Sequence, residues 1–235
     1  MVRIIAGSCA IENETQALVL AEKLKARGIT EMRAALFKPR TNPNDFQGIG
    51  YDGLPILREI QNMGLKTVTE VVGVRQIEKL YDYVDVFQIG ARNMQNFELL
   101  KEIGTTNKPI ILKRGFANTV YELLMAAEYI KQSGNKDITL CERGIRSFDD
   151  VTRNVLDIGA IIYLKQNTNY KVIADPSHST GNRNFVRSAA KAAIAAGADG
   201  IIVEVHEQPD KALSDSKQTI GLEIFDKILE DLWNK

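Results

Sequence analysis

The strongest constraint on the fold of this chain is an alternation of two kinds of segment along its 235 residues. Short runs rich in β-branched residues predict strands at 2–6, 31–36, 66–71, 84–89, 109–113, 138–141, 171–174 and 200–205. Apolar residues spaced three and four apart predict helices between them, within 17–25, 54–63, 74–81, 96–103, 120–130, 149–164, 185–196 and 219–233. A strand that is followed by a helix and then by another strand requires a parallel sheet.

Eight strand–helix units of about 29 residues each favour a closed (β/α)8 TIM barrel over a doubly wound open sheet. The open sheet usually carries a GxGxxG turn after its first strand, and no such turn occurs here. We also find no linker, no low-complexity tract and no acidic tail in the sequence. We therefore expect residues 1–235 to form one catalytic domain.

Charge and hydropathy exclude several classes of partner. Thirty Lys and Arg residues balance thirty Asp and Glu residues, which argues against a nucleic-acid coat or a polybasic membrane anchor. No apolar run approaches the ~18 residues of a membrane span, and the start of the chain is unlike a signal peptide. Two distant cysteines do not make a disulfide scaffold. We expect a cytoplasmic protein that binds neither nucleic acid nor membrane.

The predicted first strand opens at residue 2, so nothing precedes it that could cover the floor of the barrel. A bare floor would expose an apolar patch, and such patches often mark protein interfaces. We therefore expect a homo-oligomer, a dimer or a tetramer.

Six cationic side chains stand at the predicted C-terminal ends of the strands, where barrel enzymes carry their active sites. They are Arg33, Lys38, Arg40, Arg92, Lys113 and Arg143. Lys113 ends an apolar strand, where an unpaired buried cation would be costly. This clustering predicts a pocket for small polyanionic substrates, with Arg forks on phosphate and carboxylate groups. The alternative is a chance grouping of solvated surface cations.

Four potential metal ligands follow the first, seventh and eighth strands, which become neighbours when a barrel closes. They are Cys9, His178, Glu204 and Asp215. A thiolate, an imidazole and two carboxylates suit Mn²⁺, Fe²⁺, Zn²⁺ or Co²⁺ better than Ca²⁺ or Mg²⁺. For Cys9 alone, a small buried apolar side chain is the other interpretation.

These residues fall within motifs that resemble one enzyme family. The motifs are GSCAIE (7–12), KPRT (38–41), QIGARN (88–93), LKRG (112–115), CERGIR (141–146), DPSHS (175–179), EVH (204–206) and LSD (213–215). Together they resemble the 3-deoxy-D-arabino-heptulosonate 7-phosphate (DAHP) synthases, in particular the short type I-beta branch. The matches run in order through all eight predicted units.

The resemblance implies an aldol-type condensation of phosphoenolpyruvate with erythrose 4-phosphate, which releases phosphate and begins the shikimate pathway. It implies a divalent metal, Mn²⁺ first among the candidates, on the four ligands above. Phosphoenolpyruvate would be bound by Arg33, Lys38, Glu70, Arg92, Lys113 and Arg143, and the phosphate of the aldose by Arg40 and Thr41. Candidate catalytic residues are Lys38, as an electrostatic binder, and Glu142, His206 and Asp175 for proton transfer.

Two alternatives stay open. A related family makes 3-deoxy-D-manno-octulosonate 8-phosphate from arabinose 5-phosphate and typically has KANRSS where this chain has KPRT. A non-catalytic phosphometabolite-binding barrel would keep the cations and lose the metal ligands. Regulated relatives carry an additional domain, and with no room predicted for one we expect little inhibition by aromatic amino acids.

Overall fold

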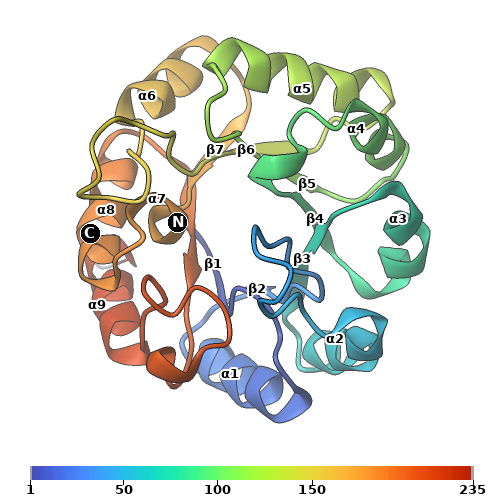
Figure 1. The fold of residues 1–235 in the computed structure, drawn as a ribbon, viewed down its shortest axis with the longest axis vertical. Helices are drawn as coiled ribbons and strands as arrows, with labels where there is room; N and C mark the ends of the chain where they lie inside the picture. Colours follow the sequence, from blue (N-terminus) through green and yellow to red (C-terminus); the bar gives the residue numbers. More distant parts are fainter. Residues whose placement is uncertain (1, 234–235) are drawn as a thin grey trace.

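The structure is a computed structural model that describes residues 2–233, and it shows the predicted barrel. Eight parallel strands pair in sequence order, and β8 closes the sheet on β1 (Figure 1). Their bounds are β1 Arg3–Gly7, β2 Glu31–Arg33, β3 Lys66–Val71, β4 Val86–Ile89, β5 Ile110–Lys113, β6 Ile138–Glu142, β7 Lys171–Ala174 and β8 Gly200–Glu204. The doubly wound open sheet is therefore excluded.

The helices form a ring around the barrel (Figure 1). Their bounds are α1 Glu14–Ala26, α2 Leu54–Asn62, α3 Val74–Leu80, α4 Phe97–Gly104, α5 Val120–Gln132, α6 Ile158–Asn167, α7 Pro176–Thr180, α8 Arg183–Ala195 and α9 Leu222–Trp233. Side-chain caps fix several of their starts, and α5 has a complete capping box between Thr119 and Glu122. No helix among the described residues is long and apolar enough to cross a membrane.

The predicted helix 149–164 is wrong over its first half. The Asp157 carboxylate accepts the Ala160 amide proton and caps α6, so the helix begins only at Ile158. The segment before it is a loop that pairs Ile145 with Val155 in an antiparallel bridge. The short helix α7, directly after β7, is an element that the periodicity did not predict.

Side chains inside the barrel lie in layers, because successive residues of a strand point to opposite faces. The middle layer is apolar and consists of Ile5, Val68, Val86, Ile111, Cys141, Ile173 and Ile202. A larger apolar core lies between the outer face of the strands and the helices. The barrel is therefore a packed core, and only its upper layer is available for a site.

The floor of the barrel is polar, contrary to the apolar patch that we expected there. Arg3 pairs with both carboxylate oxygens of Glu31, at 2.7 and 2.8 Å, and donates across the barrel to the Thr139 hydroxyl at 3.1 Å. Large exposed apolar side chains lie instead on the outer helices and the loop after β6, including Tyr121, Tyr163 and Phe148.

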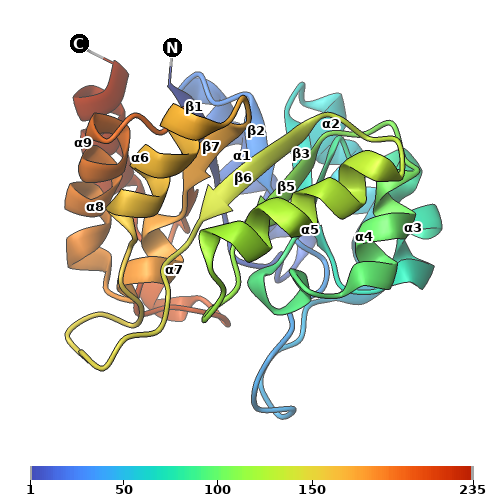
Figure 2. The ribbon, with the colours of Figure 1, turned by 90° about the horizontal axis from the view of Figure 1, so that it is seen from above.

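Two long loops project from the C-terminal end of the barrel, the one after β2 and the one after β6 (Figure 2). The opposite end holds the start of β1 and the end of α9, where the Trp233 indole donates to the Val2 carbonyl at 3.2 Å. The loops therefore surround the end at which the predicted site residues gather.

Candidate active site

The polar residues of the site form a layer above the apolar one, each two residues further along its strand. Glu70 follows Val68 by two residues, and Lys113 follows Ile111 in the same way. Because strand side chains repeat with a period of two, both point into the barrel. The same phase places the inward polar residues at Glu70, Gln88, Lys113, Arg143, Asp175 and Glu204.

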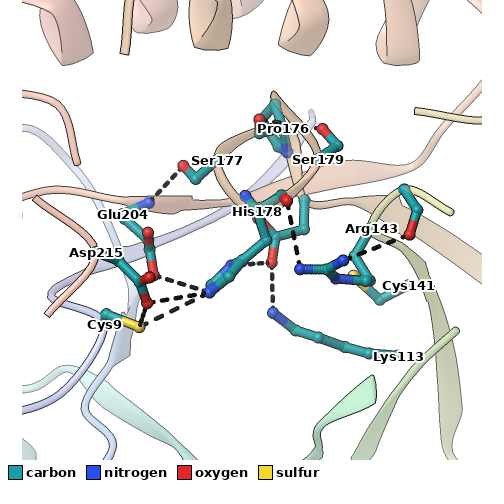
Figure 3. Close-up of polar contacts among 12 residues, drawn as sticks. Cys9, Lys113, Cys141, Arg143, Pro176, Ser177, His178, Ser179, Glu204 and Asp215 are labelled. Atoms are coloured by element: carbon teal, nitrogen blue, oxygen red, sulfur yellow. Dashed lines mark hydrogen bonds and ion pairs between the residues drawn. The ribbon is translucent and has the colours of Figure 1, made fainter. Parts of the chain in front are cut away.

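The four predicted metal ligands converge at one side of this layer (Figure 3). One donor atom from each of Cys9, His178, Glu204 and Asp215 lies within 4.8 Å of all the others. His178 Nε2 is 3.1 Å from Glu204 Oε1 and 3.7 Å from Asp215 Oδ2, and the Cys9 thiol donates to Asp215 Oδ2 at 3.0 Å. We call these four residues the ligand cluster.

Asp215 reaches the cluster from the loop after β8 through an unusual backbone conformation. Its φ of 55° lies in the left-handed region, which Asp tolerates better than most residues. Its carbonyl accepts the amide protons of Gln218 and Thr219, which fixes the turn. Burial alone would raise the pKa of the Asp215 carboxyl, but His178 and Lys38 hold it well below its ordinary value.

Two cations flank the cluster. Arg33 donates to Glu204 Oε1 at 3.1 Å and to Cys9 Sγ at 3.2 Å, and its side chain is almost fully buried. Lys38 pairs with Asp215 Oδ2 at 2.6 Å and also contacts Cys9 Sγ. Burial raises the pKa of the Cys9 thiol despite these two positive charges, so binding of a metal would release its proton.

Asp175 holds the imidazole of His178 from behind. Its Oδ2 is 2.8 Å from His178 Nδ1 and accepts from Lys113 Nζ at 2.5 Å, and its Oδ1 accepts the His178 amide proton. Although burial opposes ionisation, His178 and Lys113 hold the pKa of Asp175 well below its ordinary value. Asp175 therefore orients Nε2 toward the cluster, the usual role of a carboxylate behind a metal-binding histidine.

A cavity opens beside the cluster, and all six predicted cations line it together with Arg153. Its carboxylates are Asp45, Glu70 and Asp215, so positive charges exceed negative ones by four. His178 and Asp215 belong to both the cavity and the ligand cluster, and Lys38, which also lines the cavity, pairs with Asp215. We call this space the cation-lined cavity, and its charge suits a polyanionic ligand rather than a neutral one.

The loop after β2 forms one wall of the cavity. Arg40 pairs with Asp45 at 3.1 Å, and the Thr41 hydroxyl accepts from Arg92 at 3.3 Å. On the floor, the Glu70 carboxylate accepts from the Gln88 amide at 3.2 Å. These contacts place Thr41, one residue of the predicted aldose-phosphate site, beside Arg92, and Arg40 lines the same cavity.

Glu142 and His206, two of the predicted proton-transfer residues, do not line the cavity. Glu142 neighbours Arg143 in sequence, so it points to the outer face, where it accepts from Arg114 at 3.0 Å and from the Gly144 amide at 2.7 Å. Burial raises its pKa. The His206 ring accepts the Gln208 amide proton at 2.9 Å and is buried.

The residues of the cluster fit a divalent metal. Their donors are one thiol, one imidazole and two carboxylates, a set that borderline transition metals accept. Glu204 Oε2 is buried without any hydrogen-bond partner among residues 2–233, and a bound cation would satisfy it.

Sequence reasoning did not select seven residues of the cavity lining as site residues, among them Arg153, Phe116 and Gln88. Arg153 lies in the loop that was predicted to be helical, Phe116 lies in the loop after β5, and Gln88 was not selected as a binding residue. The period-two phase from Val86 would have found Gln88, whereas nothing in the pattern indicated the other two.

Comparison with known proteins agrees with this geometry. The family model described as the DAHP synthetase I family matches residues 1–235. The phospho-2-dehydro-3-deoxyheptonate aldolase of Thermotoga maritima is 48% identical over 230 residues, covering 97% of this chain and 68% of that protein. A 2-dehydro-3-deoxyphosphooctonate aldolase from a Geobacter species is 33% identical over 248 residues, covering 97% and 90%.

Solved structures give the same result. A crystal structure of the Thermotoga maritima phospho-2-dehydro-3-deoxyheptonate aldolase superimposes with a TM-score of 0.96 at 47% identity, covering 99% of this chain and 68% of that one. A truncated form of 3-deoxy-D-arabino-heptulosonate 7-phosphate synthase from the same organism gives 0.91 at 44% identity, covering 99% and 86%. The family match over the whole sequence and these identities establish that the chain belongs to the DAHP synthetase I family.

Proposed function

We propose that this protein condenses phosphoenolpyruvate with erythrose 4-phosphate to DAHP and inorganic phosphate. The observation that carries the proposal is that the ligand cluster and the cation-lined cavity share His178 and Asp215, and that the cavity residue Lys38 pairs with Asp215. A site built this way holds polyanions directly beside a metal. The 48% identity to a phospho-2-dehydro-3-deoxyheptonate aldolase, against 33% to an octonate enzyme, supports the four-carbon aldose.

Both substrates are anions, so the site must neutralise charge before the carbon atoms can meet. Arg92, Lys113 and Arg143 would bind the phosphate of phosphoenolpyruvate, while Arg33 and Lys38 would face its carboxylate. Holding the two reactants in a reactive orientation can lower the activation free energy by several kcal/mol. Arg40 and Thr41 would bind the phosphate of the aldose from the opposite wall.

The metal would be held by Cys9, His178, Glu204 and Asp215, and Mn²⁺ is the ion that we propose, with Zn²⁺, Fe²⁺ and Co²⁺ also suited to these donors. When bound, such an ion supplies a Lewis acid for an aldehyde oxygen. Asp175 would keep the His178 ring turned toward it. Lys38 would remain an ammonium group between the Cys9 sulfur and the Asp215 carboxylate, in an electrostatic role rather than as a Schiff base.

In the reaction, the C2=C3 π electrons of phosphoenolpyruvate form a bond from C3 to the aldehyde carbon, the C=O π bond breaks and its oxygen takes a proton, and C2 becomes electron-deficient. Water adds at C2, and the resulting phosphohemiketal loses phosphate to leave the 2-keto product. Glu70, buried on the cavity floor beside Gln88, would face the phosphoenolpyruvate phosphate through water. The cationic walls would stabilise the phosphate as it leaves.

The test is phosphoenolpyruvate consumption with erythrose 4-phosphate and, separately, with arabinose 5-phosphate, each with Mn²⁺ and with a chelator. Metal-dependent consumption with the tetrose alone is the expected result. Preference for the pentose would favour the octulosonate reaction. Absence of turnover with either aldose would favour a non-catalytic phosphometabolite-binding barrel.

We also propose that the protein forms a homo-oligomer. Support comes from exposed apolar side chains on α5 and the loop after β6, among them Tyr121, Met125, Phe148 and Val151. Light scattering at micromolar concentration tests this proposal, and a monomer would contradict it.

A further inference from the structure

Three arginines converge on one phenyl ring at the wall of the cation-lined cavity. The guanidinium carbon of Arg143 lies 4.7 Å from the centroid of the Phe116 ring, and those of Arg92 and Arg146 each lie 5.3 Å from it. The four residues come from three strand ends, because Arg92 follows β4, Phe116 follows β5, and Arg143 and Arg146 follow β6. Phe116 therefore joins three consecutive units of the barrel.

None of the three guanidinium groups lies within 4 Å of a carboxylate in the part of the chain that the structure describes. Arg92 donates to the Thr41 hydroxyl, and Arg143 donates only to backbone carbonyls, those of Gly144 and His178. Arg143 is 3% exposed, so its charge is buried without a counter-ion. Burial accordingly lowers its pKa. An anionic ligand would supply the counter-charge that this buried guanidinium group lacks.

The backbone fixes the ring in place. The Phe116 carbonyl accepts the Arg146 amide proton at 2.7 Å, which ties the loop after β5 to the loop after β6. The preceding Gly115 allows the turn, because a Cβ atom there would lie 1.9 Å from Asn118 Oδ1. The backbone of the two loops therefore holds Phe116 next to Arg146.

An aromatic ring is well suited to hold arginines that must also bind phosphate. A carboxylate partner would occupy the N–H groups of a guanidinium, whereas a ring contacts its face and leaves the N–H fork free. The free fork can then form the paired hydrogen bonds that phosphate oxygens accept.

We propose that Phe116 is a positioning residue for the phosphate-binding arginines, and that Arg146 belongs to the same phosphomonoester site as Arg92 and Arg143. The proposal rests on the proposed function for the identity of the ligand, phosphoenolpyruvate. Arg146 is exposed and contacts the ring of Phe116, which lines the cavity. Its charge would therefore draw the dianion toward the buried pair and add a third guanidinium to the site.

The test compares Phe116→Leu, which keeps apolar bulk without a ring, with Phe116→Tyr, which keeps the ring. Calorimetric titration with phosphoenolpyruvate, and separately with inorganic phosphate, is done in chelator so that metal does not contribute. We expect Phe116→Leu to weaken phosphoenolpyruvate binding about tenfold, as loss of several cation–π contacts implies, and Phe116→Tyr to bind within about threefold of wild type. The KM for phosphoenolpyruvate should rise in parallel, with little change in kcat.

Arg146→Gln should weaken binding a few-fold and make it less sensitive to salt, because an exposed charge is screened by ions. In the Phe116→Leu background the same substitution should add little, since the two residues act as a unit. The matched control is Tyr83→Leu, which removes an Arg58 cation–π contact of 4.9 Å outside the cavity lining and should leave binding unchanged.

Three outcomes distinguish failure of the proposed role of Phe116 and Arg146 from failure of the proposed function. If wild type binds phosphoenolpyruvate and both Phe116→Leu and Arg146→Gln bind it equally well, the role of Phe116 and Arg146 is refuted. If Phe116→Leu does not fold, an unchanged affinity and salt dependence in Arg146→Gln refutes it instead. If wild type binds inorganic phosphate in a Phe116-dependent manner but not phosphoenolpyruvate, the anion site stands and the proposed substrate is wrong.

Discussion

Replacing Asp175 with Asn tests whether the carboxylate behind His178 sets up the ligand cluster. The two oxygens of Asp175 accept three donors, from the His178 ring, the His178 backbone amide and the Lys113 ammonium group. An amide has a single acceptor oxygen, and its NH2 group would face one of those donors. The imidazole would then lose the hydrogen bond that aims Nε2 at the cluster.

Loss of such a supporting carboxylate typically costs 10–100-fold in metal affinity. We therefore expect Asp175→Asn to bind Mn²⁺ or Zn²⁺ more weakly by about 1.4–2.7 kcal/mol. The substitution also leaves Lys113, whose side chain is 5% exposed, without its counter-ion. Breaking a buried pair costs about 3–5 kcal/mol, which in a chain of this size lowers Tm by roughly 6–20 °C.

The assay is calorimetric metal titration below the melting range, with thermal unfolding followed in parallel. Asp199→Asn is the matched control, because Asp199 also accepts from one lysine and one backbone amide, Lys165 and Val172, but lies at the other end of the barrel. It should lower Tm without changing metal affinity. Equal metal affinity in folded Asp175→Asn and wild type would refute the positioning role, whatever the loss of Tm.

Other predictions concern metal, acid stability and the cavity floor. Treatment with a chelator should abolish turnover but retain phosphoenolpyruvate binding by calorimetry, and Mn²⁺ should restore turnover. Although burial acts in the opposite direction, Lys165 and the Val172 amide hold the pKa of Asp199 below its ordinary value. The ionised Asp199 carboxylate therefore contributes fully to the stability of the fold above about pH 4, and this contribution is lost as the pH falls through the lower pKa of the folded state. In denaturant unfolding, wild type should therefore be more stable than Asp199→Asn at pH 7, and the difference in free energy of unfolding should shrink as the pH falls below that folded pKa. Gly90→Ala should lower kcat/KM by about tenfold or more, because its Cβ would lie 2.0 Å from Glu70 Oε1. The φ of Gly90 is −69°, which alanine adopts without strain, so the substitution acts through its contact with Glu70. Unchanged steady-state kinetics would show that the position of Glu70 is unimportant.

The barrel could be predicted because its strands are short, buried and rich in β-branched residues. The predicted strands at 66–71 and 171–174 coincide with β3 and β7. The 149–164 helix was wrong because local spacing of apolar residues does not reveal tertiary pairing. Here Arg153 and Asn154 donate their amide protons to Thr180 and Ser179, and these bonds hold the segment as a loop against α7.

The site was predictable where a residue type and a strand end coincide, as for Cys9, His178, Glu204 and Asp215. A position at a strand end does not by itself predict a site residue, because the alternation of side chains along the strand decides whether each one points into the barrel or away from it. Glu142 and Arg143 are adjacent, yet only Arg143 lines the cavity. Phe116 carried no signal, because a phenylalanine in a loop has no period, and its role depends on arginines up to 30 residues away in sequence.

The charges of the site divide it into two halves. Beside the ligand cluster, Arg33 and Lys113 already face Glu204 and Asp175, so their positive charges are balanced within the protein. Around Phe116, in contrast, the guanidinium groups have no carboxylate within 4 Å among residues 2–233. A doubly charged phosphate gains most where no carboxylate competes for the same N–H groups. We therefore propose that the phosphate of phosphoenolpyruvate binds on the Phe116 side, with its enolpyruvyl part extending toward the ligand cluster.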